Sequence, residues 1–84
     1  MKLLFSERAW DDYLHWQARD EKILERLNTL IREASRTPFQ GIGKPEPLRG
    51  DLSGWWSRRI TLEHRLVYRP GDGVLQIGEC RYHY

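Results

Sequence analysis

The sequence predicts an α+β fold in which two N-terminal helices pack on one face of a small antiparallel sheet. Two patterns support this prediction. Between residues 7 and 37, apolar side chains recur with helical spacing, whereas after residue 55 they alternate as in strands and are interrupted by turn residues. The expected order of elements is therefore β-α-α-β-β-β, and a length of 84 residues predicts one domain over residues 1–84.

The N-terminal half contains the expected first strand and both helices. The apolar run KLLF at residues 2–5 is typical of a buried or edge strand. Ser6 is a suitable N-cap for a helix over residues 7–18, and Asp20 is one for a second helix that ends at Thr37-Pro38. The second helix carries its apolar stripe at Ile23, Leu24, Leu27, Leu30, Ile31 and Ala34.

A long loop separates the helices from the remaining strands. Residues 38–54 are rich in proline and glycine, which predicts a structured loop with a very short strand near Pro47-Leu48. We expect three strands after this loop, with a first turn at Glu63-His64 and a second at the sequence PGDG. These strands are predicted over residues 55–62, 65–69 and 74–82.

Alternation within the strands divides their side chains between two faces. In the 55–62 strand, we expect Ile60 and Leu62 to face the core, with Arg58 either snorkelling to solvent or pairing with an acid. Arg59 then lies on the open face. The last strand has an apolar start and a polar end on the same parity, which predicts a strand that leaves the core or contains a bulge.

The composition indicates the cellular compartment and the kind of binding partner. Residues 41–84 hold seven Lys/Arg, six of them arginine, against five Asp/Glu, so a phosphate-bearing partner and a solvated basic surface fit equally well. A single cysteine, Cys80, excludes an internal disulfide and suits a reducing cytoplasm. We expect no membrane span and no signal peptide. Zinc spacing is absent, so we expect neither a metal nor a cofactor.

A set of late polar residues predicts chemistry on RNA. Taken singly, Glu46 fits a solvated loop acid, Arg65 fits an edge charge and His83 fits a residue without a role. Taken together, they match cleavage by the RNA 2′-OH, which needs a base, an acid and a cation over the phosphate. The imidazole of His83 can exchange a proton near neutrality, and tyrosine rings can stack unpaired bases.

Three stretches resemble a known family. The sequences GKPEPLRGDLSGWWSRRI, EHRLVY and CRYHY, in this order, resemble the YoeB branch of the RelE-like bacterial toxins. The resemblance implies a fold of the microbial-ribonuclease type. It also implies the toxin of a type II toxin–antitoxin system, an endoribonuclease that cleaves mRNA in the A site of the ribosome and stops translation. The implied partners are mRNA, the ribosome and its rRNA, a YefM/Phd-type antitoxin, operator DNA through the antitoxin complex, and a second copy in a homodimer.

The resemblance also assigns roles residue by residue. Glu46 of KPEPL corresponds to the general base, Arg65 of HRLVY to the group that stabilises the transition-state phosphate, and His83 to the general acid. The remaining expected RNA-binding residues are Lys44, Arg49, Arg59, Arg81 and Tyr84. Arg49 stands where the family commonly has lysine, and Ile42 stands where relatives can have a polar or basic residue.

Two other functions compete with this interpretation. ParE-like gyrase poisons share the arrangement of helices on a sheet but lack the combination of glutamate, arginine and histidine. A non-catalytic RNA- or ribosome-binding module is the second alternative, with Glu46 and His83 in structural roles.

Overall fold

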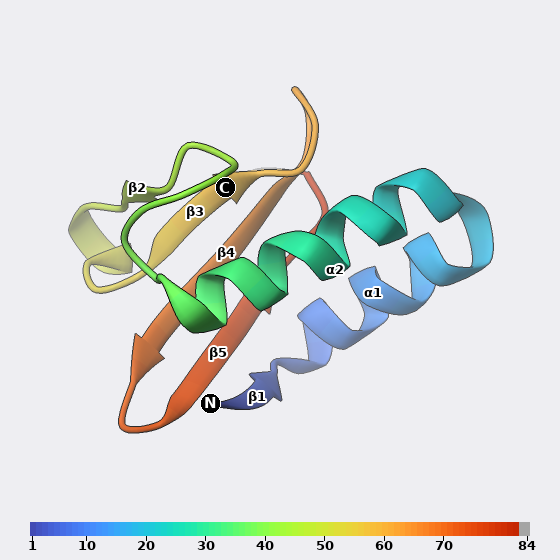
Figure 1. The fold of residues 1–84 in the computed structure, drawn as a ribbon. Coiled ribbons are helices and arrows are strands. Elements are labelled where there is room, and N and C mark those ends of the chain that lie inside the picture. The colour runs from blue at the N-terminus through green and yellow to red at the C-terminus, as the bar shows by residue number, and fades with distance from the viewer. Residues whose placement is uncertain (83–84) are drawn as a thin grey trace.

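The computed structural model describes residues 1–82 and places two helices against one face of a five-stranded sheet (Figure 1). The sheet order is β1-β5-β4-β3-β2. This architecture confirms the α+β prediction, and β2 corresponds to the very short strand predicted near Pro47-Leu48. The elements are β1 (Lys2–Phe5), α1 (Glu7–Arg19), α2 (Glu21–Arg36), β2 (Glu46–Pro47), a 3₁₀ turn (Gly50–Leu52), β3 (Trp56–Arg59), β4 (Arg65–Gly71) and β5 (Val74–Glu79).

One strand pairing departs from the predicted antiparallel sheet. β1 pairs with β5 in parallel, with Lys2 opposite Val74 and Phe5 opposite Ile77, whereas the other three pairs are antiparallel. A parallel pair needs a long crossover rather than a tight turn. Here the two helices and the hairpin strands lie between β1 and β5 in the chain, so the sheet is mixed.

Local capping explains where the helices begin and end. The Ser6 hydroxyl accepts a hydrogen bond from the amide of Ala9 at 3.0 Å, and the Asp20 carboxylate accepts one from the amide of Ile23 at 3.1 Å. α2 stops just before Thr37, as predicted. Neither helix in the described part of the chain is long and apolar enough to cross a membrane.

The core lies between the helices and the inner face of β4 and β5. The buried apolar residues come from both layers and include Ala9, Trp16, Leu27, Leu30, Ile31, Ala34, Ile60, Leu66, Tyr68, Leu75, Ile77 and Cys80. Burial of this kind supplies most of the stability of a small domain. Because α1 and α2 cover only this side, the opposite side of β2, β3 and β4 remains free of α-helices (Figure 1).

The thiol of Cys80 is shielded within this core. Burial raises its pKa to about 12, and the carboxylates of Asp12 and Glu79 act in the same direction. The pKa of the Cys80 thiol is higher in the folded than in the unfolded chain. The stability that the protonated thiol contributes is therefore complete below pH about 9 and is lost as the pH rises towards 12.

We expect iodoacetamide at neutral pH to modify Cys80 only at the rate of unfolding. Rapid modification of the native protein, measured by mass spectrometry, would contradict this.

Arg58 differs from its prediction, because it is fully buried and neither snorkels nor pairs with an acid. Its guanidinium donates hydrogen bonds to the Tyr68 hydroxyl at 3.0 Å and to three backbone carbonyls. These carbonyls belong to Thr37, Gln40 and Ile42. Oxygen dipoles therefore compensate the buried charge, and Arg58 fixes the loop that leads from α2 towards β2.

The ends of β3 and β5 also differ from prediction. β3 ends at Arg59, and Leu62, predicted in the core, is 86% exposed in a loop. The amides of Ile60 and Thr61 donate to the carbonyl of His64, so this segment turns back on itself. β5 ends at Glu79 and contains the predicted irregularity, because the register shifts between Val67 and Tyr68 of its partner strand.

Candidate nucleic-acid interface

Five strand residues share the face of the sheet that points away from the helices, which we call the open face. Glu46 lies opposite Ser57, Ser57 lies opposite Val67, and Arg59 lies opposite Arg65. Side chains on neighbouring strands alternate together between faces, and Leu66 and Tyr68 occupy the core side. The strand register therefore brings a carboxylate and two guanidinium groups to the same side of the sheet.

The pair Arg59 and Arg65 on the open face lowers the stability of the free protein. Like charges placed directly opposite on adjacent strands destabilise a sheet by roughly 0.2–1 kcal/mol. The Nε atoms of Arg59, Arg65 and Arg81 are buried and have no hydrogen-bond partner within residues 1–82. A buried donor without a partner costs free energy, which an anionic oxygen placed between these groups would recover. The arrangement therefore suits a phosphate.

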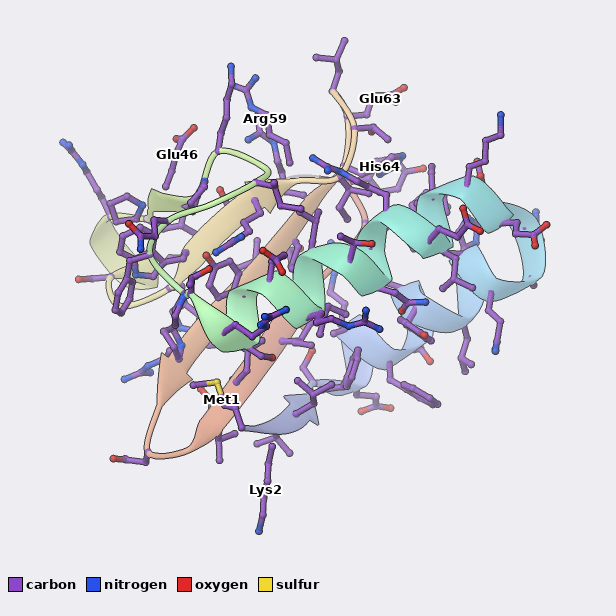
Figure 2. All side chains as sticks on the ribbon, in the orientation of Figure 1. Met1, Lys2, Glu46, Arg59, Glu63 and His64 are labelled. Carbon is purple, nitrogen blue, oxygen red and sulfur yellow. The ribbon has the colours of Figure 1, made fainter. Side chains whose placement is uncertain are left out.

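Glu46 is exposed and projects from the same end of the molecule as Arg59 (Figure 2). Its position is diagonal to Arg59 across the β2–β3 pair, a relation that separates backbone positions by about 7–8 Å.

The loop that precedes β2 is held against the end of β3, because the amide of Arg59 donates to the carbonyl of Gly43 at 2.7 Å. Gly43 has φ +83°, and a side chain there would meet Leu30 at 2.8 Å, so glycine is required.

The other predicted RNA-binding residues lie at the margin of this face or outside the described structure. Lys44 and Arg49 are exposed on the loops that flank β2. Arg81 follows β5, and its guanidinium lies over the Tyr82 ring at 4.9 Å. His83 and Tyr84 fall outside the described residues, so the predicted meeting of His83 with Glu46 and Arg65 stays a prediction.

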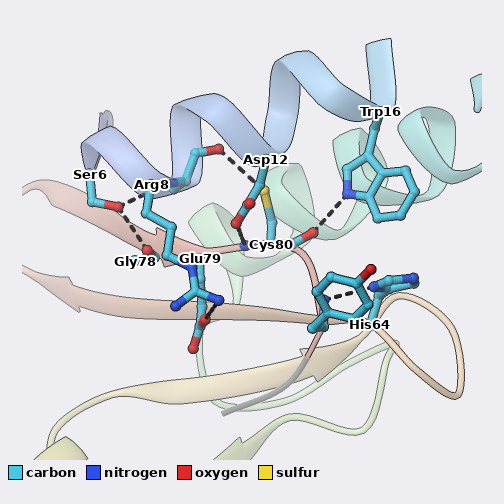
Figure 3. A network of polar contacts seen from close by, with 10 residues as sticks. Ser6, Arg8, Asp12, Trp16, His64, Gly78, Glu79 and Cys80 are labelled. Carbon is cyan, nitrogen blue, oxygen red and sulfur yellow. Dashed lines mark hydrogen bonds and ion pairs between the residues drawn. The ribbon is translucent and has the colours of Figure 1, made fainter. Parts of the chain in front are cut away.

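Residues 80–82, which we call the tail segment, are attached to the rest of the protein at several points (Figure 3). The amide of Cys80 donates to the Asp12 carboxylate at 3.0 Å, and the indole of Trp16 donates to the carbonyl of Cys80 at 2.8 Å. The Arg65 amide donates to the carbonyl of Tyr82 at 3.0 Å. These bonds fix residues 80–82, which lie beyond the end of β5 and are not part of a strand.

Comparison with known proteins identifies the family. The model of a family described as "YoeB-like toxin of bacterial type II toxin-antitoxin system" matches residues 5–84. The chain belongs to this family. Toxin YoeB of Escherichia coli (strain K12) is 61% identical over 84 residues, which cover 100% of both chains.

Solved structures agree with this membership. A YoeB/ParE toxin from Agrobacterium tumefaciens is 57% identical, with a TM-score of 0.96 and 100% of both chains covered. YoeB of Staphylococcus aureus, solved as a heterotetrameric YoeB-YefM complex, is 42% identical with a TM-score of 0.92, covering 100% of this chain and 98% of that chain. The microbial-ribonuclease-like, RelE-like fold expected for a YoeB-like toxin is thus confirmed.

Several contacts in this YoeB-like toxin were missed by sequence reasoning. Asp12 and His64 both hold the tail segment, yet neither was singled out. Asp12 occurs at helical spacing between Ala9 and Trp16 on the buried side of α1, a signal for a carboxylate with a buried partner. Ile42 contributes its carbonyl rather than its side chain, so the unusual residue type at this position leaves the bond from Arg58 in place.

Proposed function

We propose that this YoeB-like toxin is an endoribonuclease that depends on the ribosome and cleaves mRNA in the A site, thereby inhibiting translation. The observation that carries this proposal is the opposed pair Arg59 and Arg65 on the same face as Glu46, with Nε donors that find no hydrogen-bond partner within residues 1–82. These two guanidinium groups repel each other in the free protein, and an anionic substrate bound between them would remove this cost. Membership of the family of YoeB-like toxins supports RNA as that substrate.

The proposed mechanism uses the nucleophile that RNA carries. Glu46 removes the proton of the 2′-OH, and the resulting oxygen attacks the adjacent phosphorus. The bond to the 5′ oxygen breaks, and His83 donates the proton that this leaving group needs, which gives a 2′,3′-cyclic phosphate and a 5′-OH. Arg65 and Arg59 stabilise the negative charge that builds on the phosphate. Lys44, Arg49 and Arg81 bind the RNA backbone, and Tyr84 positions the scissile nucleotide.

The shape of the site supports the proposed dependence on the ribosome. Glu46 is exposed on a two-residue edge strand, and the open face is a sheet surface on which two arginines stand side by side. Such a surface attracts phosphate but does little to orient one nucleotide. Orientation of the reacting groups accounts for a large share of catalytic power, and a decoding site that holds the codon in place supplies it.

We also propose the partners and compartment that the family implies. A YefM/Phd-type antitoxin neutralises this toxin, and the pair represses its operon by binding operator DNA through the antitoxin. The toxin forms a homodimer and acts in the cytoplasm. Support comes from the Staphylococcus aureus relative, solved both with YefM and as a YoeB dimer.

A primer-extension assay tests the proposed activity. A message translated in a purified system is expected to show a new 5′ end within the A-site codon when the protein is added, and no cleavage when ribosomes are omitted. Persistence of full-length message on translating ribosomes, with the protein bound to them, would instead favour a non-catalytic binding module.

A further inference from the structure

The tail segment turns at Tyr82 through an unusual backbone conformation. Tyr82 has φ +61°, in the left-handed region that favours glycine, although it carries a bulky aromatic side chain. This conformation is unfavourable for an L-residue, because its Cβ comes close to the backbone carbonyl. Strain of this kind persists only where surrounding contacts impose it, and it gathers at functional sites.

The contact that opposes this strain most directly comes from His64. The Tyr82 amide donates to Nδ1 of His64 at 2.7 Å (Figure 3). A ring nitrogen that accepts a hydrogen bond carries no proton, so this geometry requires a neutral imidazole with its hydrogen on Nε2. The ring also packs between two aromatic residues, Trp16 with centroids 4.7 Å apart and Tyr82 at 5.0 Å.

His64 is itself held by a tight loop. Its amide donates to the Thr61 hydroxyl at 3.1 Å, and its carbonyl accepts from the amide of Ile60 at 2.9 Å. The next residue, Arg65, donates to the carbonyl of Tyr82. The imidazole therefore projects from a fixed position, and Tyr82 is bound on both its amide and its carbonyl.

We propose that His64 is a positioning residue, whose neutral imidazole holds the left-handed turn at Tyr82, the residue that directly precedes His83 in the sequence. The inference rests on the proposed function, because it matters for catalysis only if His83 transfers a proton. A proton on Nδ1 would face the amide hydrogen of Tyr82, so only the neutral ring can make this contact.

Two substitutions separate the acceptor from the ring. His64→Leu removes the acceptor but keeps apolar bulk, and it is expected to lower the single-turnover rate of messenger cleavage by about 10²-fold, the usual cost of a small misplacement. His64→Asn returns an oxygen near the position of Nδ1, and it is expected to recover most of this loss. Glu63→Gln, in the same loop and exposed, is the matched control. Cleavage by His64→Leu at the wild-type rate would overturn the proposal.

Amide exchange separates failure of this inference from failure of the proposed function. In the folded wild type and in His64→Asn, the Tyr82 amide is expected to exchange slowly by NMR at pH 8, and in His64→Leu it is expected to exchange at least tenfold faster. Slow exchange in His64→Leu would refute the anchor. If exchange responds as expected but His83→Gln still cleaves messenger at the wild-type rate, the anchor stands and the catalytic role of His83 is what fails.

Discussion

Replacing Glu46 with glutamine is expected to lower the single-turnover rate of messenger cleavage on programmed ribosomes by about 10²–10⁴-fold. Glutamine keeps the size and hydrogen-bonding capacity of the side chain but cannot take a proton from the 2′-OH. Glu46 is exposed on a two-residue edge strand and makes no side-chain hydrogen bond within residues 1–82. The melting temperature is therefore expected to stay within a few degrees of the wild type.

The matched control for Glu46→Gln is Glu63→Gln, which makes the same change of charge at an exposed loop position. Glu63 lies outside the strands that form the open face, so its variant is expected to cleave like the wild type. Co-sedimentation with ribosomes should be retained in both proteins. If Glu46→Gln cleaves at a rate near that of Glu63→Gln, the carboxylate is not the base, and a non-catalytic role for this loop becomes the better explanation.

Replacing Arg58 with methionine is expected to lower the free energy of unfolding by about 3–5 kcal/mol. Methionine fills much of the space of the arginine stem, but it leaves the Tyr68 hydroxyl and the carbonyls of Thr37, Gln40 and Ile42 without their donor. Such a loss is a large share of the roughly 5–15 kcal/mol that stabilises a typical domain. Urea unfolding followed by circular dichroism measures it.

The adjacent residue gives the opposite result. Arg59→Met removes one member of a like-charge pair, and the Nε of Arg59 has no hydrogen-bond partner within residues 1–82, so the unfolding free energy should change by less than about 1 kcal/mol. Messenger cleavage should nevertheless fall by about 10²–10³-fold, because a cation over the phosphate is lost. An unchanged urea midpoint for Arg58→Met, or a strongly lowered one for Arg59→Met, would show that the two arginines have been assigned to the wrong roles.

The helices were predictable because their signals are local. Ser6 and Asp20 cap the two helices through bonds to amides three residues away, and the proline after Thr37 stops the second. The parallel partner of β1 was not predictable in this way. Strand pairing between residues more than 70 positions apart depends on the path of the whole chain, and the sequence of residues 2–5 holds no trace of it.

The candidate site was predicted in part. Alternation in β3 correctly placed Arg59 away from the core, and the register then added Arg65 beside it. Alternation also placed Arg58 on the core side, but a charged residue there is ordinarily exposed or paired with an acid. Its actual partners are backbone carbonyls of a loop, which carry no side-chain signal. The same reason hid His64, whose partner is the amide of Tyr82.

The central claim is that Glu46 removes a proton and His83 supplies one at the same phosphodiester. The most direct test uses a messenger in which sulfur replaces the 5′ bridging oxygen at the cleavage site, because a thiolate leaves without needing a proton. We expect this substrate to restore cleavage by His83→Gln and to leave Glu46→Gln inactive. Equal rescue of both variants, or rescue of neither, would contradict the assignment of the base and the acid.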